Sequence, residues 1–493
     1  MSGPALTRQI GLVAIGRGAL ALSTFAVSAL LSWNWTPAEM GIYRTVWYLA
    51  NTLFPFFLLG FPTSFLYFFP RLKTAGQQAL VLQAGLCLAL SGLLLGLLLT
   101  WGGPYLSFLL DFETRPLTQE LQLYLGAFMP YACFWIAGGL AEPALVAAGR
   151  PQWQAWLGMG MAAAQLGLAV VALVGAWQVQ TVLWGFSLLG GVRLAAAAWL
   201  VSRAVGWRTV GWSGEGLGAY LHYCLPVALG DVVGSLSRAV DRLVVLWFFS
   251  TETFAFYDLG AIEIPVSLLL ASATTVLIPQ VSRLYSEGRR ADIAALWSEA
   301  VRRLSLVVLP AFFLLFFLAG PLISVLLPLA YVNSAWVMRI FLLALPLRCA
   351  IYNPLLVGMG KARWAWWVGA GDLVLNIVLS VLLSKALLTG WPAWAFLGPA
   401  LATVIATYAQ VAVLLGLIAS HLGWGVRQLL PWAHLGRVAL VSALAGLSGW
   451  GVALLVGPPL AQVLVGAVVF GGVLLLGARP EDREVFLKLQ KSR

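Results

Sequence analysis

Seven arginine residues lie inside apolar segments of this chain, where a permanent positive charge needs compensation. A charged side chain at the centre of a bilayer costs about 2.5–3.5 kcal/mol on insertion scales, so such residues face partners, water or a cavity. The guanidinium group holds two phosphate oxygens at once and does not deprotonate, which favours binding of an anionic headgroup. The seven are Arg17, Arg44, Arg193, Arg238, Arg242, Arg339 and Arg348.

Five of these arginines are our candidates for a hydrated, cationic substrate-binding cavity. The other two, Arg44 and Arg339, lie near the outer ends of their segments, where a long side chain can instead reach the membrane interface. The five candidates are Arg17, Arg193, Arg238, Arg242 and Arg348.

The segment 217–248 carries the densest group of charges. On a helix that turns about 100° per residue, Asp231, Ser235, Arg238 and Arg242 fall within about 40° of one face. Arg238 and Arg242 are four residues apart, so they repel each other unless something anionic lies between or opposite them. Two structural ion pairs, Asp231 with Arg238 and Asp241 with Arg242, are an alternative that the sequence leaves open.

Carboxyl groups within apolar segments suggest a second kind of chemistry. Asp231, Glu263 and Asp372 are candidates for coupling transport to H⁺ or Na⁺, and Asn376 lies four residues after Asp372. A membrane-embedded carboxyl group can carry a proton or bind a cation between two conformations. Pairing with arginine would keep the group ionised and prevent proton carriage. Ion coupling is therefore a hypothesis, and the absence of any coupling is its alternative.

The composition indicates that these residues belong to a membrane protein. Of the 493 residues, 61% are hydrophobic and 10% are charged, whereas soluble domains have about 45–50% and about 25%. The mean hydropathy is +0.92. These values exclude a disordered chain and a disulfide scaffold, and they argue against a soluble enzyme. The four cysteines and three histidines show no metal-ligand spacing, so we predict no metal site and no cofactor.

Apolar segments long enough to cross a bilayer recur along the whole chain. Most Lys and Arg residues outside them fall in alternate loops, and the opposite loops contain only Arg115, with Lys385 near an outer end. This asymmetry predicts the cytoplasmic membrane, with both termini in the cytoplasm, and accounts for the net charge of +11 without nucleic acid. The fourteen segments are 10–32, 41–69, 77–101, 118–147, 153–175, 179–202, 217–248, 254–281, 303–327, 334–359, 364–388, 393–419, 435–456 and 459–478.

Two pairs of matching segments indicate an internal duplication. EPALVAAGRPQWQAW at 142–156 matches NPLLVGMGKARWAWW at 353–367, at an offset of 211 residues. GIYRTV at 41–46 matches AFYDLG at 255–260, at an offset of 214 residues. The repeat unit then has six spans, an even number, so both copies enter the membrane in the same direction.

The duplication predicts an all-α polytopic membrane protein. Its fourteen transmembrane helices form two parallel-repeat lobes of six helices around a central cavity, with two extra C-terminal helices. The predicted parts are an N-terminal lobe at 1–212, a C-terminal lobe at 213–425, two further spans at 426–478 and a basic cytoplasmic tail at 479–493. Residues 283–303 read either as an amphipathic helix on the cytoplasmic interface, with arginines reaching lipid phosphates, or as a solvated connector.

The order of several motifs resembles a known family. After the six-span duplication come LPVALGDVVGSLSRAVDRLVVLWFFSTETFAFYDLG, a span ending LIPQVSRLYSEG, the GMGKARW loop and GPALATVIATY. Over residues 8–420 this resembles the polysaccharide, or O-antigen, repeat-unit flippases of the multidrug and oligosaccharidyl-lipid exporter superfamily. The resemblance implies alternating access and a substrate of sugars on a polyprenyl pyrophosphate. The arginine-rich opening of the peptidoglycan-precursor flippases is matched by Arg17 alone.

The favoured function is therefore a flippase for a polyprenyl-pyrophosphate-linked oligosaccharide, used in surface polysaccharide assembly. The alternative is a cation-coupled drug or metabolite antiporter of the same superfamily, for which a cavity rich in acids and aromatic rings is expected. A membrane glycosyltransferase would need a large catalytic loop, and a structural scaffold would not explain the buried charges. We predict that the chain is not an enzyme and binds no nucleotide, because its glycine-rich stretches lack the Lys-Ser/Thr of a phosphate loop.

Overall fold

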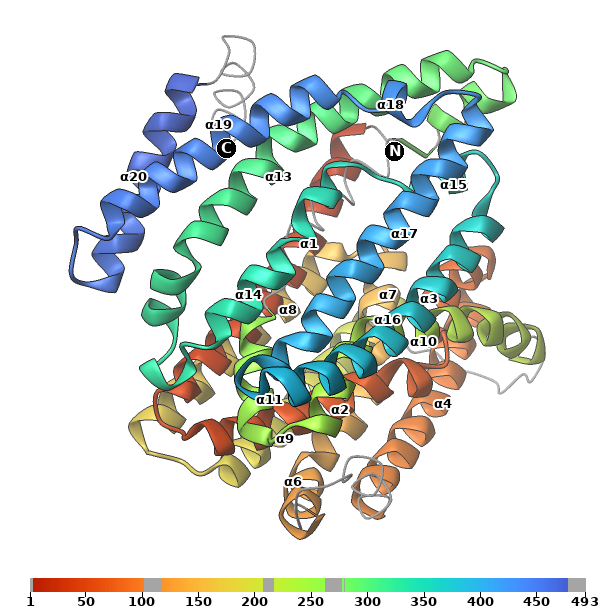
Figure 1. Ribbon diagram of the computed structural model, residues 1–493. Coiled ribbons are helices and arrows are strands. Elements are labelled where there is room, and N and C mark those ends of the chain that lie inside the picture. The colour runs from red at the N-terminus through yellow and green to blue at the C-terminus, as the bar shows by residue number, and fades with distance from the viewer. Residues whose placement is uncertain (1–2, 102–117, 207–216, 262–276, 279, 478–493) are drawn as a thin grey trace. The chain divides into compact units, whose positions relative to one another are not determined.

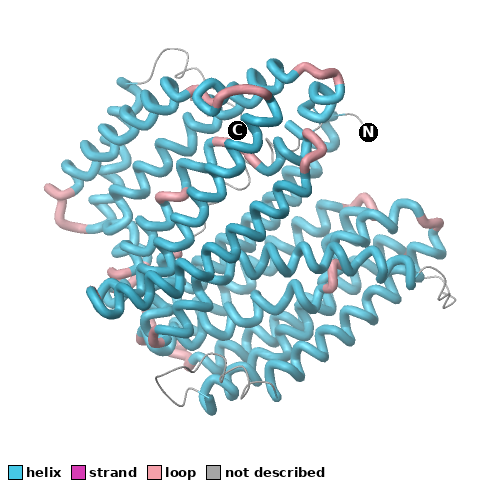
Figure 2. Tube along the Cα trace, turned by 45° about the vertical axis from the view of Figure 1, so that its right-hand side comes forward, coloured by secondary structure: helices cyan, strands magenta, loops and turns pink. Residues whose placement is uncertain are grey.

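The computed structural model describes residues 3–101, 118–206, 217–261, 277–278 and 280–477, and within these ranges the elements are all helices joined by short turns (Figures 1 and 2). The helices divide into two compact units. Unit 1 comprises residues 1–239 and 246–255, and unit 2 comprises 240–245 and 256–493. The predicted lobe boundary at 212/213 lies outside the described residues, as does the predicted tail at 479–493.

Unit 1 is built from long helices that pack against one another in pairs. Helix α1 packs along α8, α4 along α6, and α6 along α9. The elements are α1 (Gly3–Ser32), α2 (Pro37–Leu58), α3 (Phe61–Phe68), η1 (Phe69–Arg71), α4 (Thr74–Trp101), α6 (Thr118–Ala137), η2 (Gly138–Leu140), α7 (Ala141–Ala147), α8 (Pro151–Val174), α9 (Val179–Val205) and most of α10 (Leu217–Phe248).

Unit 2 has the same kind of packing. Helix α16 packs along α17, α19 along α20, and the long α13 against both α19 and α20. The elements are α11 (Thr251–Gly260, shared with unit 1), α13 (Arg290–Leu326), η3 (Leu329–Tyr331), α14 (Ser334–Leu342), η4 (Leu345–Cys349), α15 (Asn353–Gly358), α16 (Ala362–Gly390), η5 (Pro392–Leu397), α17 (Gly398–Leu422), α18 (Val426–Leu429), α19 (Trp432–Ala453) and α20 (Pro459–Gly477).

Eleven helical stretches among the described residues are long and apolar enough to cross a membrane. This makes the chain a multi-pass membrane protein. The first predicted span contributes a shorter apolar stretch, Gly16–Ser32. The seventh is the continuous helix α10, which carries four charged residues between positions 231 and 242, and most of the eighth lies outside the described residues. The predicted count of fourteen therefore stays a prediction.

Three of the predicted spans are broken rather than continuous. The span at 41–69 is interrupted between α2 and α3, where Leu59 and Gly60 take positive φ values of 52° and 68°. The span at 118–147 changes to the short 3-10 helix η2, and the span at 334–359 changes to η4 at Pro346. Such breaks matter for function because they release backbone groups inside the membrane and bend the helix.

The segments matched by the internal repeat fold alike. Gly149 and Gly360 both have φ of 73°, a left-handed conformation that favours glycine. Before each glycine a short helix ends, and the following Arg150 or Lys361 donates its backbone N–H five residues back, at 2.8 Å in both copies. The second pair also agrees, since Thr36 and Ser250 cap α2 and α11 through their hydroxyl groups, at 3.4 and 3.2 Å.

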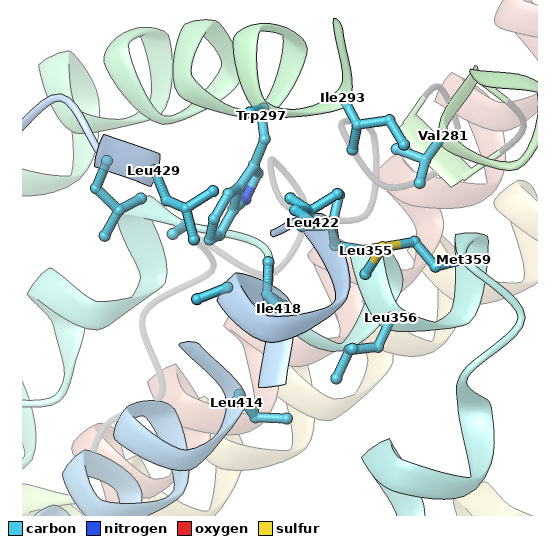
Figure 3. Packing of buried hydrophobic residues seen from close by; sticks show 14 of the residues in the cluster. Val281, Ile293, Trp297, Leu355, Leu356, Met359, Leu414, Ile418, Leu422 and Leu429 are labelled. Carbon is cyan, nitrogen blue, oxygen red and sulfur yellow. The ribbon is translucent and has the colours of Figure 1, made fainter. Parts of the chain in front are cut away.

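The segment 283–303 corrects one interpretation of the sequence. Its second half is the start of α13, and Ile293 and Trp297 there are fully buried. They pack inside the protein against α15, α17 and α18, in a cluster that includes Met359, Ile418 and Leu429 (Figure 3). The apolar face of this amphipathic helix is thus covered by the protein itself, so the second half of the segment is not a solvated connector, and contact of its arginines with lipid phosphates stays a prediction.

Candidate functional site

One carboxylate in unit 1 pairs with one of the predicted arginines and acts electrostatically on a second. Arg17 on α1 forms an ion pair with Glu142 on α7. Gln154 on α8 donates to the other carboxylate oxygen at 3.4 Å, and Arg193 on α9 lies within the electrostatic reach of Glu142. Two positive charges on one acid leave this group, which we call the Arg17–Glu142–Arg193 group, with an excess of positive charge. The Arg17 side chain remains 66% exposed, so a further anion can approach it.

Arg193 is held in place by an aromatic ring. Its guanidinium lies 4.1 Å above the ring centre of Trp135 on α6, an attractive cation–π contact. A Cβ at Gly138 would stand only 3.2 Å from its Nη1, so the small residue at the start of η2 makes room for the charge. The break in the fourth span therefore helps to position Arg193, because Gly138 of η2 leaves room for the guanidinium of Arg193 on α9.

A second group surrounds a cavity of about 400 Å³ in unit 1. Its walls come from the broken span α2–α3 on one side and from α10 on the other. Asp231 and Arg238 are the charged residues of its lining, and both are exposed. The lining residues are Pro55, Leu58, Pro62, Thr63, Gly230, Asp231, Gly234 and Arg238. We call this space the α3/α10 cavity.

Arg238 has no hydrogen bond or ion pair with any residue that the structure describes. The alternative of a direct Asp231–Arg238 pair is thus not what the described residues form, although both charges face the same space. Leu58, which lines the cavity, packs so closely against Gly139 of η2 that a Cβ there would clash with it. The arrangement offers an unsatisfied guanidinium next to an apolar wall, which suits an anion attached to a lipid.

Arg242, one helical turn further along α10, has a different environment. Its Nε donates to Asp258 on α11 at 2.7 Å, its Nη1 lies 3.7 Å from Asp241, and its Nη2 donates to the carbonyl of Ala261 at 3.2 Å. Both carboxylates are almost fully buried, and Asp241 also accepts the Tyr257 hydroxyl at 3.0 Å. Of the two interpretations of Arg242, the structure favours the ion pair. The charge is balanced inside unit 2 and is not presented to a ligand.

Unit 2 contains its own cavity of about 340 Å³ between α16 and α17. It is lined by Trp364, Trp367, Asp372 and Gln410 among apolar side chains. One carboxylate oxygen of Asp372 is buried and has no hydrogen-bond partner among the described residues. One turn further along α16, the Asn376 side-chain oxygen accepts hydrogen bonds from the hydroxyls of Ser380 and Thr403, at 3.0 and 3.3 Å.

The remaining candidates are not part of these groups. Arg348 is exposed on η4 in unit 2, and Glu263 lies outside the described residues. Arg44 donates to the Ser28 hydroxyl at 2.9 Å, and Arg339 donates to the carbonyl of Phe316 at 3.3 Å. The sequence did not point to Trp135, because a tryptophan in an apolar segment carries no signal of the cation that stacks on it.

The fold is that of the MOP superfamily of transporters. The lipid II flippase MurJ, in an inward closed conformation, superposes with a TM-score of 0.71 at 16% identity, over 94% of this chain and 98% of that one. An inward-facing multidrug resistance MATE family transporter gives 0.63 at 13% identity, over 82% and 94%. A MOP superfamily transporter from Pyrococcus furiosus, described as having a binding pocket of reverse polarity, gives 0.55 at 16% identity, over 85% and 95%. The matched structures are transporters rather than enzymes.

The family model described as "Polysaccharide biosynthesis protein" matches residues 155–335, which include α10 and the α10–α11 turn. No curated protein sequence matches the chain significantly. The resemblance predicted from the motifs, to the polysaccharide branch of the exporter superfamily, is confirmed by the family match together with the fold.

Proposed function

We propose that the protein flips a polyprenyl-pyrophosphate-linked oligosaccharide across the cytoplasmic membrane by alternating access, for assembly of a surface polysaccharide. The observation that carries this proposal is Arg238, an exposed arginine that makes no hydrogen bond or ion pair among the described residues and lines, together with Asp231, a cavity built from a broken span and α10. A pyrophosphate needs positive charge that the protein has not already neutralised. The family match to polysaccharide biosynthesis proteins supports the sugar-bearing substrate.

The role of each charge follows from its surroundings. Arg238 binds the pyrophosphate, since its N–H groups donate to no acceptor among the described residues, and Asp231 acts on it only through the space of the cavity. Arg17 and Arg193 form a second cationic position, where an arriving phosphate competes with Glu142. Competition of this kind lets the anion be released again, as a transporter requires. The cytoplasmic location of both termini belongs to the same proposal.

The test is the substitution Arg238→Gln in the full-length protein, produced in cells that lack the native gene. We expect lipid-linked saccharide to accumulate in the membrane and surface polysaccharide to fall at least tenfold, because one charge-assisted contact to phosphate is lost. Arg303→Gln, an exposed arginine paired with Glu299, is the matched control and should export normally. Full export by Arg238→Gln and by Arg17→Gln would refute the proposal.

The cavity between α16 and α17 supports binding of a coupling ion. It also supports the alternative function, a cation-coupled antiporter. A carboxylate oxygen of Asp372 is buried without a partner, in a cavity with two tryptophan rings, and H⁺, Na⁺ or an organic cation would satisfy it. Asp372→Asn should make the transport rate insensitive to imposed proton and sodium gradients. A rate that is already flat across both gradients in the unchanged protein would exclude coupling. If Asp372→Asn lost export of cationic dyes while lipid-linked and surface saccharides stayed unchanged, the antiporter would be supported instead.

A further inference from the structure

An exposed stack of aromatic and cationic groups lies where α3 ends and α10 begins. The guanidinium carbon of Arg71 is 3.5 Å from the ring centre of Tyr67. The rings of Tyr67 and Tyr223 are stacked at 4.8 Å and 12°, and Phe68 packs edge-on against Tyr223. We call Arg71, Tyr67 and Tyr223 the Arg71 stack. All three belong to unit 1, as does the α3/α10 cavity.

The polar groups of the Arg71 stack are exposed and available for hydrogen bonds to a ligand. Tyr67 and Tyr223 are 41% and 38% exposed, and Arg71 is exposed as well. Neither the guanidinium nor the two hydroxyl groups make a hydrogen bond or ion pair within the described part of the chain. Stacking occupies the face of a guanidinium but leaves its N–H edge open for phosphate oxygens. A rigid stack also lowers the side-chain entropy that such binding would otherwise cost.

The stack is in register with the α3/α10 cavity. On α3, Tyr67 follows Thr63 by four residues, and on α10 Tyr223 precedes Gly230, Gly234 and Arg238 by seven, eleven and fifteen, spacings that keep residues on one helix face. At 1.5 Å per residue, Arg238 lies about 22 Å beyond Tyr223 along α10. Arg71 on η1, directly after α3, and Arg238 on α10 thus lie at different depths along one seam.

We propose that the Arg71 stack is the receiving position for the pyrophosphate of the lipid-linked substrate, from which the anion passes along the α3/α10 seam to Arg238. This inference rests on the proposed function. The shared chemistry is a phosphate on a lipid, which a resident phospholipid also offers. The second arginine favours the lipid-linked pyrophosphate over a resident phospholipid. A general headgroup site would not need Arg238, which lies deeper along the same seam and makes no hydrogen bond or ion pair among the described residues.

The chain provides a matched control for the stacking itself. Arg203 lies 5.3 Å from the ring of Trp199, four residues earlier on α9, and both side chains are exposed. This pair has an arginine and an aromatic ring like the stack, but both belong to α9, which contributes no residue to the cavity, whereas α3 and α10 both do. If arginine–aromatic pairs served only as interfacial anchors, Arg71 and Arg203 would behave alike.

The experiment measures equilibrium binding of full-length protein in detergent by native mass spectrometry, with undecaprenyl pyrophosphate and phosphatidylglycerol as separate probes. We expect Arg71→Gln to weaken binding of the pyrophosphate about tenfold and that of phosphatidylglycerol less than twofold. Arg71→Lys should give an intermediate loss, since it keeps the charge without the planar fork. Arg203→Gln should match the unchanged protein with both probes. In flipping assays, Arg71→Gln should lower the rate mainly at low substrate, and Arg238→Gln at all concentrations.

The outcomes separate this inference from the proposed function. Pyrophosphate binding that depends on Arg238 but not on Arg71 overturns the receiving position and leaves the flippase intact. Equal losses for both probes in Arg71→Gln also overturn it, in favour of an ordinary phospholipid site. No pyrophosphate binding by the unchanged protein would overturn the flippase and the receiving position together. Should Arg71→Gln fold poorly, Tyr67→Leu provides the same comparison through loss of the stacking partner.

Discussion

Two helix pairs at corresponding positions of the predicted repeat make the same contact with different chemistry. In unit 1, Arg44 of α2 donates to the Ser28 hydroxyl of α1 at 2.9 Å. In the second pair, Arg242, in the part of α10 that belongs to unit 2, donates to Asp258 of α11 at 2.7 Å. Ser28 and Arg242 are 214 residues apart, and so are Arg44 and Asp258, which is the offset of the predicted repeat. The contact is thus found in both pairs, but the second helix supplies the cation in one pair and the first helix in the other.

The exchange explains why the arginines of the two units serve different purposes. Unit 2 surrounds Arg242 with two buried carboxylates, so its charge stabilises the helix pair. Unit 1 leaves Arg238 without a hydrogen bond or ion pair among the described residues and pairs Arg17 with a single acid, Glu142. An arginine within the membrane is thus either structural or available to an anion, and the position of the nearest acid decides which.

The largest effect is expected from breaking the buried pair of unit 2. Asp258→Asn should lower the free energy of unfolding by about 3 kcal/mol, because removal of one partner leaves a buried charge poorly compensated. Denaturant titration of the purified full-length protein in detergent measures the change. Arg242→Ala should likewise lower the free energy of unfolding, and any loss of transport in this variant should follow from that loss of stability rather than from weaker substrate binding.

The matched control is the triple variant Asp241→Asn/Arg242→Met/Asp258→Leu, which removes all three charges of the cluster at once. Replacing buried ion pairs by uncharged side chains of similar size is often neutral, so stability should return close to that of the unchanged protein. If the single variant were as stable as the triple one, the contrast between the two units would lose its energetic basis.

A smaller effect of the opposite kind is expected from the acid of unit 1. Glu142→Gln removes the carboxylate that Arg17 and Arg193 share, so binding of undecaprenyl pyrophosphate should strengthen several-fold. Stability should fall by only about 1 kcal/mol, since Arg17 is largely exposed and can turn to water. Unchanged or weaker binding would show that Glu142 does not compete with the substrate.

These expectations show where sequence reasoning succeeded and where it stopped. The helical period correctly placed Asp231 and Arg238 on one face of α10, and both line one cavity. It placed Arg242 on that face as well, but a period says nothing about the neighbouring helix. Asp258 reaches Arg242 only because the turn after α10 folds α11 back along it. The break at Leu59 has a local signal, since Gly60 takes a left-handed conformation and Pro62 lies in the first turn of α3, whereas the exact place of η2 follows from packing.

The repeat itself provides a prediction of intermediate size. Gly149→Ala and Gly360→Ala should each cost about 1 kcal/mol, because a Cβ is strained at a φ of 73°. Neither glycine has a neighbouring atom where a Cβ would stand, so backbone strain is the whole effect. Equal losses of unfolding free energy at the two positions would support the common origin of the turns. A difference of more than about 1 kcal/mol would mean that the two turns have diverged.

The smallest effect tests whether burial, rather than charge pairing as such, separates the arginines. Arg303 and Glu299 form an ion pair at 2.7 Å, as short as that of Arg242 and Asp258, but their side chains are 73% and 52% exposed. Glu299→Gln should change the free energy of unfolding by less than about 0.5 kcal/mol, because water screens an exposed pair and replaces the lost partner. A loss as large as that of Asp258→Asn would make distance the determinant, and Arg17, which is paired and exposed, would then have to be counted among the structural arginines.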